Sequence, residues 1–401
     1  MSDSRPIRTR SDLLKLLTEA AELEHGIACS YLYAGFSLKR DISEGGLTWQ
    51  QQQMVRRWAA QIYFIASQEM LHLALVWNMM TAIGGTPYYL RPNFPQPTNY
   101  YPIHVPIELE PFGLPSLRRF IRYEHPQHVS SARKLKSLLA LAGDDAEEIE
   151  FGTVGELYQL IESGFSNIAE KELFIGPETQ QMTTDLIHFP SLIKVVDRTS
   201  AIAAIAEITH QGEGVIDDRV DSHFGAFVAM LKETLDSRSK GFSPARPALR
   251  NPSARVERGY GARSHAIDDP LSMQVAALFD SVYSLMLRML AWSFEFDAEG
   301  CEQQLKKFCA VAIDIMPRVL LPMGEGLMLM PAGKKYPGKT AGPGFGLTRH
   351  VTLPPEAKNA QQLCKERFTE LAGLSSGLLK EDIPEAVKNG CRHLENIANA
   401  L

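Results

Sequence analysis

Two long helical patterns near the start of the chain each carry a glutamate in the middle of an apolar stripe. Around Glu24 apolar residues recur three, four and seven positions away on both sides, and around Glu69 they recur at the same offsets apart from one histidine. This spacing places both carboxylates on the face that each helix buries. A buried carboxylate costs several kcal/mol unless it is neutralised, paired or bound to a metal, so the folded chain must give both glutamates a partner.

The histidine is His72, which lies one turn after Glu69 on the same face of the helix. No lysine or arginine lies on either stripe near the two glutamates, which argues against ion pairing. A lone Glu-x-x-His pair is common by chance, and it gains weight here because Glu24 lies on a matching stripe. A glutamate on one helix and a Glu-x-x-His pair on its neighbour form half of a di-iron or di-manganese site in carboxylate-bound helical bundles.

A complete site of this kind needs ligands from a second pair of helices. The stretch "AIAEITHQGEGVIDDRVDSHFGAF" places Glu207, His210 and Glu213 at three-residue spacing, and His223 opens the helical pattern that follows. These are more donors than one site can use, and the choice between Glu207 and His210 stays open. The predicted metal ligands are Glu24, Glu69, His72, His210, Glu213 and His223, and the predicted catalytic residues are Glu24, Glu69 and Glu213.

The helical patterns predict a mainly α fold. Patterns at about 11–40 and 48–83 predict one antiparallel hairpin, and patterns at about 199–214 and 221–235 predict a second. No strand-like alternation of any length occurs. The expected architecture is a four-helix bundle made of two antiparallel hairpins, with additional C-terminal helices and long ordered loops.

The rest of the chain is expected to surround this bundle. The bundle spans residues 11–235 and contains an inserted strap, 86–198, whose first part is too rich in proline for a long helix. Residues 236–268 are dense in serine, arginine, proline and glycine and predict a surface loop. Residues 269–401 predict a helical extension that packs on the bundle.

Composition limits the partners and the compartment. A net charge of −6 and a pI near 6.0 give no general electrostatic reason to bind nucleic acid or anionic lipid. The sequence has no signal-peptide pattern and no uncharged apolar run of about 18 residues, so we expect a cytoplasmic protein without a membrane span. The five cysteines lack CxxC spacing and predict reduced thiols rather than a zinc site.

The ordered set of motifs resembles the ferritin-like domain family named for iminophenyl-pyruvate dimer synthase, which occurs in the enzymes of violacein and rebeccamycin biosynthesis. The resemblance implies a ferritin-like bundle with a di-metal site at Glu24, Glu69, His72, Glu213 and His223. At the position of His210 the family often has a glutamate. The resemblance rests on "LEHGIACSYLYA" (23–34), "QEMLHLALVWNMMTAIGGTP" (68–87), "NFPQPTNYYPIHVPIELEPF" (93–112), "TVGELYQLI" (153–161), "QGEG" (211–214), "SHFGAF" (222–227), "MPRVLLPMGEGLMLMPAG" (316–333) and "KTAGPGF" (339–345).

Site and resemblance together predict a non-haem di-metal oxidase or oxygenase. It would use two iron ions, or manganese with the same ligands, and O2 to oxidise an amino-acid-derived small molecule or tethered intermediate of secondary metabolism. An apolar substrate pocket is expected beside Ile27, Tyr31, Ile65 and Phe227. The alternatives are a non-catalytic metal-binding or partner-stabilising protein, and a relic that holds one metal.

The expected partners follow from the same interpretation. They are a small-molecule substrate, O2 and a partner enzyme of the same pathway, with neither nucleic acid nor a membrane among them. A homodimer stays possible alongside a monomer, because the sequence does not distinguish solvent-exposed helix faces from faces buried in a dimer.

Overall fold

The computed structural model of the chain describes residues 7–97, 106–126, 139–140, 153–212, 222–237, 241–255, 264–295, 302–347, 349 and 351–400. Most of these residues are helical, and the strands among them are the short parallel pair β1 (Pro252–Ser253) and β2 (His265–Ala266). The expected mainly α class is therefore confirmed.

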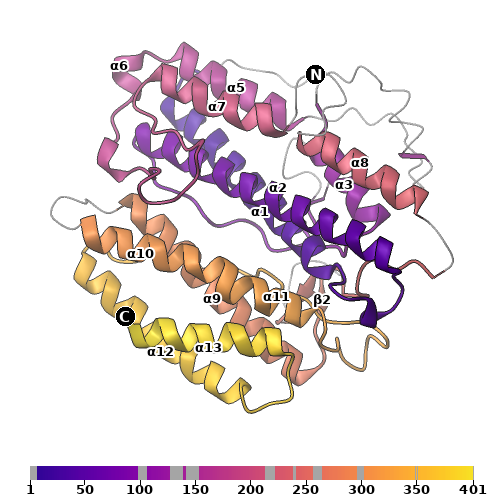
Figure 1. The fold of residues 1–401 in the computed structure, drawn as a ribbon. Helices are drawn as coiled ribbons and strands as arrows, with labels where there is room; N and C mark the ends of the chain where they lie inside the picture. The colour runs from indigo at the N-terminus through magenta and orange to yellow at the C-terminus, as the bar shows by residue number, and fades with distance from the viewer. Residues whose placement is uncertain are drawn as a thin grey trace.

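The centre of the molecule is an antiparallel hairpin of two long helices, α1 (Arg10–Ser37) and α2 (Trp49–Ala82), with the turn η1 (Ile42–Glu44) between them (Figure 1). Thr9 caps α1 by accepting a hydrogen bond from a backbone N–H of the first turn, and Thr48 caps α2 in the same way. Their apolar stripes pack along the whole hairpin, which confirms the first predicted pair of helices.

Four shorter helices complete the bundle: α3 (Leu114–Tyr123), α5 (Val154–Asn167), α7 (Arg198–Gly212) and α8 (His223–Asp236). Two short elements, α6 (Glu170–Leu173) and η2 (Glu178–Gln180), connect α5 to α7. In Figure 1 these helices lie along α1 and α2, opposite the C-terminal helices.

The third column of the bundle is α3 followed by α5, both antiparallel to α1. Phe112, just before α3, donates its backbone N–H to Ser37 Oγ at the end of α1 over 2.8 Å. Tyr158 of α5 donates to Glu24 at the middle of α1. The chain therefore runs along this column in the direction opposite to α1.

The fourth column is α7 followed by α8, both antiparallel to α2. The side chain of Asn78, late in α2, donates to the carbonyl of Ile193 just before α7 over 2.9 Å. Trp58, early in α2, donates to Glu233 near the end of α8 over 2.6 Å. The two helices thus follow one another in one direction along α2.

This arrangement corrects the predicted second hairpin. The helices expected at 199–214 and 221–235 do not fold back on each other; α7 packs on α5, and α8 packs on α3, which the prediction had placed within the strap. The physical reason is length. At about 1.5 Å per residue, helices of 14 or 15 residues cannot match α2, which has 34, so each outer column needs two helices. The bundle still has two antiparallel pairs of columns.

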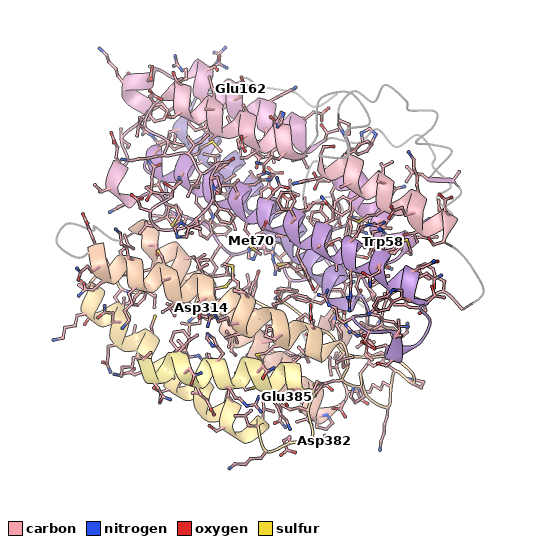
Figure 2. The ribbon with its side chains drawn as sticks, in the orientation of Figure 1. Trp58, Met70, Glu162, Asp314, Asp382 and Glu385 are labelled. Atoms are coloured by element: carbon pink, nitrogen blue, oxygen red, sulfur yellow. The ribbon has the colours of Figure 1, made fainter. Side chains whose placement is uncertain are left out.

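The C-terminal helices form a separate layer against α1 and α2 (Figure 1). Figure 2 shows Met70 of α2 near the middle of the molecule, whereas Asp314 and Glu385 lie in this layer. The layer consists of α9 (Pro270–Glu295), α10 (Glu302–Ile315), the π-helical turn η3 (Met316–Leu320), α11 (Leu321–Leu327), α12 (Ala357–Leu378) and α13 (Glu385–Ala400).

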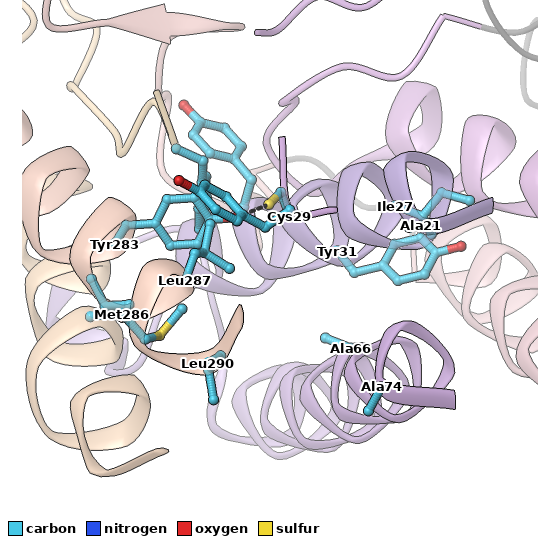
Figure 3. Packing of buried hydrophobic residues seen from close by; sticks show 14 of the residues in the cluster. Ala21, Ile27, Cys29, Tyr31, Ala66, Ala74, Tyr283, Met286, Leu287 and Leu290 are labelled. Atoms are coloured by element: carbon cyan, nitrogen blue, oxygen red, sulfur yellow. Dashed lines mark hydrogen bonds between the residues drawn. The ribbon is translucent and has the colours of Figure 1, made fainter. Parts of the chain in front are cut away.

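Helix α9 forms the core of the C-terminal layer. By length and composition it could cross a membrane, but 72% of its most apolar window is buried inside the fold. Figure 3 shows Tyr283, Met286 and Leu287 on the part of α9 that faces α1, with Cys29 beside Tyr283. Packing in the core explains the apolar character of this helix.

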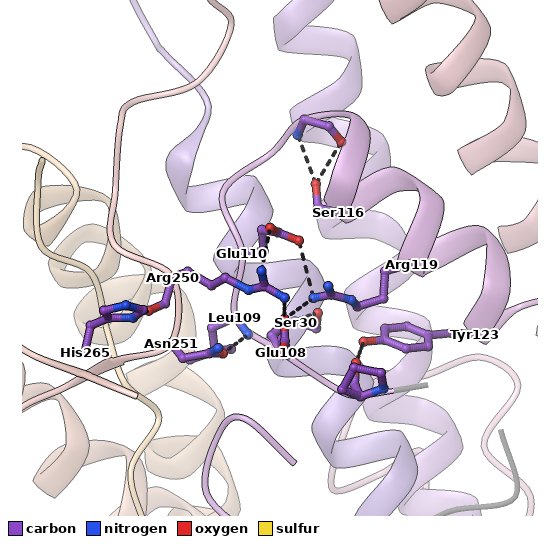
Figure 4. A network of polar contacts seen from close by, with 12 residues as sticks. Ser30, Glu108, Leu109, Glu110, Ser116, Arg119, Tyr123, Arg250, Asn251 and His265 are labelled. Carbon is purple, nitrogen blue, oxygen red and sulfur yellow. Dashed lines mark hydrogen bonds and ion pairs between the residues drawn. The ribbon is translucent and has the colours of Figure 1, made fainter. Parts of the chain in front are cut away.

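The strap before α3 is held by a buried charge network (Figure 4). The Glu108 side chain, 3% exposed, accepts from Arg119 Nη1 over 2.7 Å and also contacts Arg250. Its backbone carbonyl accepts from Ser30 Oγ on α1 over 2.7 Å. These contacts fix the strap to α1 and α3.

The described part of the predicted surface loop is packed rather than exposed. Arg246 and Asn251 are buried, and Arg246 Nε pairs with Glu44 over 2.6 Å beside the α1–α2 connection. Proline and glycine indicate irregular backbone, but they do not distinguish a loop on the surface from one whose polar groups are bonded inside the fold.

Candidate metal centre

Three predicted ligands meet between α1 and α2. His72 Nδ1 lies 3.0 Å from Glu69 Oε2 and 3.5 Å from Glu24 Oε2. All three side chains are buried, and one donor atom from each lies within 4.8 Å of the others. Helical spacing produces this group, since Glu69 and His72 are one turn apart and Glu24 faces them from the neighbouring stripe.

A second group of three donors adjoins the first. His223 Nδ1 lies 2.8 Å from Glu69 Oε1 and 3.5 Å from Glu124 Oε2, again with every donor buried and within 4.8 Å of the others. His223 is the first residue of α8, where Ser222 caps the helix by accepting from the N–H of Gly225. Glu124 is the C-cap residue of α3.

Glu69 belongs to both groups and contributes a different oxygen to each. Oε2 faces His72 and Oε1 faces His223, while the two imidazole rings lie 5.6 Å apart at 28°. Two sets of three oxygen and nitrogen donors that share one carboxylate match the ligand chemistry of two divalent metal ions bridged by a glutamate.

One pair of donor atoms is placed for a common cation rather than for each other. Glu69 Oε1 and His223 Nδ1 are buried 2.8 Å apart, yet neither makes a hydrogen bond with acceptable angles. A cavity of about 20 Å³ lies between the carboxylates of Glu24, Glu69 and Glu124, which is enough for about one water-sized particle. The residues present therefore fit a metal centre.

The outer nitrogen of each histidine faces a glutamine oxygen. His72 Nε2 lies 3.2 Å from Gln211 Oε1, and His223 Nε2 lies 3.1 Å from Gln68 Oε1. An amide oxygen only accepts, so each Nε2 carries the proton and donates it. Nδ1 of both histidines is therefore the nitrogen that would offer a lone pair to a metal ion once the ion has displaced the Nδ1 proton.

Two tyrosines orient the outer carboxylates. Tyr158 of α5 donates to Glu24 Oε1 over 2.5 Å, and Tyr31 of α1 donates to Glu124 Oε1. The other oxygen of each carboxylate, Oε2, faces the histidine of its own group of donors. Hydrogen bonds of this kind hold metal-ligating carboxylates in one orientation.

Glu124 is a ligand candidate that the sequence interpretation missed. It follows the short helix "LPSLRRFIRY", in the part of the chain that the sequence interpretation assigned to the inserted strap 86–198. Leu117, Phe120 and Ile121 precede it by seven, four and three residues, and all three are buried. Glu124 thus has apolar residues at helical offsets on its N-terminal side only, whereas Glu24 has them on both sides.

His210 is brought to neither group. Its side chain is exposed, because the inner face of α7 carries Ala204, Ile208 and Gln211. His210 follows Ile208 by two residues, which turns it about 200° around the helix. The structure therefore places Gln211, rather than His210, against the site.

Of the two remaining predicted donors, one lies among the described residues and the other does not. Glu207 is half-buried and accepts from Gln211 Nε2, so it lies behind the glutamine that contacts His72. Glu213 lies outside the described residues. Of the predicted set, the structure brings together Glu24, Glu69, His72 and His223.

The sequence model of the Ferritin-like family matches residues 17–232, which is more than half of the chain. The chain belongs to the Ferritin-like family. This finding agrees with the paired columns around Glu24 and Glu69 and confirms the expected fold class. A solved ferritin-like protein from Caulobacter vibrioides shares 20% identity with this chain, with a TM-score of 0.47 over 72% of this chain and 89% of the other.

Two curated relatives cover most of this Ferritin-like chain. It is 29% identical over 92% of its length to dichlorochromopyrrolate synthase of Lentzea aerocolonigenes, and 28% identical over 84% to 2-imino-3-(indol-3-yl)propanoate dimerase of Chromobacterium violaceum. It spans only 39% and 34% of these relatives, respectively. The matches confirm the family resemblance drawn from the motifs.

Burial and mutual contact shift the pKa values of the cluster in opposite directions. Burial would raise the pKa of Glu69, but His223 and His72 outweigh it and hold that pKa well below its usual range. Burial raises the pKa of Glu24 to about 7, with a further contribution from the Glu69 charge. Burial also raises the pKa of Glu124.

The histidines respond to the carboxylates around them. Burial would lower the pKa of His223, but Glu69 and Glu124 raise it to about 9. Glu69 and Glu24 likewise raise the pKa of His72 well above its usual value despite burial. The cluster thus favours positive charge among its carboxylates, which either protons or metal cations can supply.

A cavity of about 330 Å³ lies between α2 and the C-terminal layer and reaches Glu69 at one side. Its walls are mostly apolar and include Met70, Trp77, Phe294 and Phe345. This location corrects the predicted pocket, which had been placed on the opposite side of α1.

The four residues predicted to line a substrate pocket are packed core instead. Tyr31 and Phe227, for example, are buried with ring centroids 4.9 Å apart. Of the four, Ile27 borders the small space between the carboxylates, and none lines the larger cavity among the described residues.

One corner of the cavity is polar. His25 Nε2 contacts Tyr283 Oη, and Cys29 Sγ lies 3.1 Å from the same hydroxyl (Figure 3). Arg91 lies behind them, with Nη2 3.5 Å from Cys29 Sγ and 2.8 Å from the carbonyl oxygen of Phe345. Burial, followed by the charge of Arg91, lowers the pKa of His25 well below its usual value, so its imidazole is neutral.

Proposed function

We propose that this chain is a non-haem di-metal oxidase or oxygenase that uses two iron ions and O2 to oxidise an amino-acid-derived small molecule or tethered intermediate. The observation that carries the proposal is the position of Glu69. Its carboxylate is shared by two groups of metal-type donors and borders an apolar cavity large enough for a small organic molecule. Manganese would use the same ligands.

The protein's contribution is to hold a charged donor set in a dry site. Glu24, Glu69 and His72 would hold one ion, and Glu69, Glu124 and His223 would hold the other. The chemistry that a bound ferrous pair supplies is electron transfer to O2. Glutamine and tyrosine partners keep the ligands oriented, and burial excludes bulk water.

The cavity supports a substrate with an apolar body and a polar end. Trp77, Phe294 and Phe345 form aromatic walls, and the His25–Tyr283 corner supplies polar atoms. His25 Nε2 and Cys29 Sγ both contact the Tyr283 hydroxyl, so these three side chains are the polar groups that this corner would offer to a ligand. The names of the two relatives, which refer to pyrrole- and indole-containing compounds, are consistent with an aromatic substrate derived from an amino acid.

The relatives also support a partner in the reaction. Both are more than twice as long as the region they share with this chain. A second enzyme of the same pathway, acting before or after the step proposed here, is therefore part of the proposal. The cytoplasmic location and the homodimer stay predictions.

The proposal is tested by loading the protein anaerobically with ferrous iron, measuring the metal content and then following O2 uptake. We expect two irons per chain and consumption of O2 with a change in the optical spectrum. One metal or none, without O2 uptake, would contradict the enzyme and favour a non-catalytic metal-binding or partner-stabilising protein.

A further inference from the structure

Helix α9 separates two cavities of opposite character. Its apolar side, with Met286, Leu287 and Leu290, lines the cavity beside the metal centre. A second cavity, of about 350 Å³, is lined in part by Asp280, Ser281, Ser284 and Arg288. These residues form a polar stripe at helical spacing on α9. These four polar residues are half-buried, and they face the second cavity rather than the apolar one.

Three arginines from separate parts of the chain converge on this second cavity. Arg288 comes from α9, Arg367 from α12 and Arg255 from the segment after β1. One carboxylate, that of Asp280, lines the same space. The lining therefore carries an excess of positive charge and, through its serines, additional hydroxyl donors.

The one carboxylate of the lining balances the three guanidinium charges only in part. Asp280 Oδ1 accepts from the backbone N–H of Gly346 over 2.9 Å, so the loop at Gly346 takes part of its bonding capacity. Arg367 pairs with Glu370 over 2.6 Å, but both side chains are substantially exposed and such pairs are weak. Among the residues that the structure describes, no partner reaches the buried Nε of Arg288.

We propose that this cavity binds a small organic anion that carries carboxylate or phosphate groups. Guanidinium groups from three elements match such groups because each offers parallel N–H donors in one plane. The volume exceeds what a single inorganic ion needs, and the serine hydroxyls supply neutral donors beside the charges. The cavity is lined by none of the metal-centre donors, so the site is independent of the proposed oxidation.

The test is calorimetric titration of the metal-loaded full chain with tricarballylate and, separately, with glycerol 3-phosphate, at constant ionic strength. The two probes distinguish a carboxylate ligand from a phosphate ligand. We expect saturable binding of at least one probe, weakened about tenfold or more in Arg288→Gln and in Arg367→Gln because each loses a charged donor. Arg367 is half-exposed, so its variant keeps the test valid if Arg288→Gln does not fold.

Arg392→Gln is the matched control, since Arg392 lies on α13 outside the cavity lining and is half-exposed. It should bind the probe as the parent does, and all three variants should keep the parent metal content. Absence of saturable binding for both probes, or equal weakening in the control, would overturn the proposal. Metal content is a separate readout, so loss of the anion site and failure of the metal centre are distinguishable.

Discussion

Glu69 Oε1 and His223 Nδ1 lie 2.8 Å apart in the core, and neither atom makes a well-directed hydrogen bond. Buried polar atoms without partners are rare, and two that approach each other in this way point to a third species between or beside them. The other oxygen of Glu69 faces His72 at 3.0 Å. Glu69 is therefore the shared ligand in the proposed centre of two metal ions.

Replacing the shared carboxylate should remove both metals. We expect Glu69→Ala to reduce the iron content from two per chain to below one. The variant should remain a folded helical protein, because His72 and His223 can become neutral once the carboxylate that raises their pKa values is gone. Elemental analysis and circular dichroism measure the two effects. Glu162→Ala on the outer face of α5 is the control (Figure 2) and should keep both metals. Two tightly bound irons in Glu69→Ala would disprove the shared role.

Glu124 and His210 distinguish the structural ligand set from the sequence-based one. Glu124→Gln should lower the metal content to about one per chain, since Glu124 belongs only to the group with His223. His210→Gln should leave two metals, because the side chain is exposed. The reverse pattern, with His210 required and Glu124 dispensable, would show that the described arrangement is not the metal-binding one.

Metal binding should weaken as the pH falls. His223, whose pKa is raised to about 9, and His72, whose pKa is also raised, are protonated in the metal-free protein at neutral pH. A metal ion must displace these protons, so its apparent affinity rises as the pH increases toward 9. Calorimetry at pH 7 in buffers of different ionisation enthalpy should detect proton release. Binding that releases no protons and is independent of pH between 6 and 8 would refute this prediction.

The strap network should contribute more to stability than a surface ion pair. Glu108→Gln leaves the side chain of Arg119 without its closest charge partner, and loss of one partner of a buried pair costs about 3–5 kcal/mol. Glu178→Gln, which breaks the exposed pair with Lys194, should cost less than about 1 kcal/mol. Urea unfolding curves compare the two variants. Equal free energies of unfolding would contradict the importance assigned to the strap.

The sequence predicts the ligands that lie on long amphipathic helices. Glu24, Glu69 and His72 were found because their apolar neighbours recur at helical offsets over several turns. Glu124 has apolar neighbours at these offsets only on its N-terminal side, because its helix is short and ends there. The structure does not bring His210 to the cluster, because three-residue spacing alone does not show which face of α7 is turned inward.

The column arrangement and the cavity depend on contacts between distant segments. Two short helices in line, such as α7 and α8, resemble a hairpin in sequence, since periodicity does not encode the direction of the following helix. The larger cavity lies where α2 meets the C-terminal layer, and its walls come from residues far apart in the chain. Local patterns of burial do not contain this information.

The most direct measurement is anomalous diffraction at the iron edge from crystals of the iron-loaded protein. The account predicts two peaks on either side of the Glu69 carboxylate, one beside His72 Nδ1 and the other beside His223 Nδ1. A single peak, or two peaks of which neither lies within bonding distance of Glu69, would contradict the central claim.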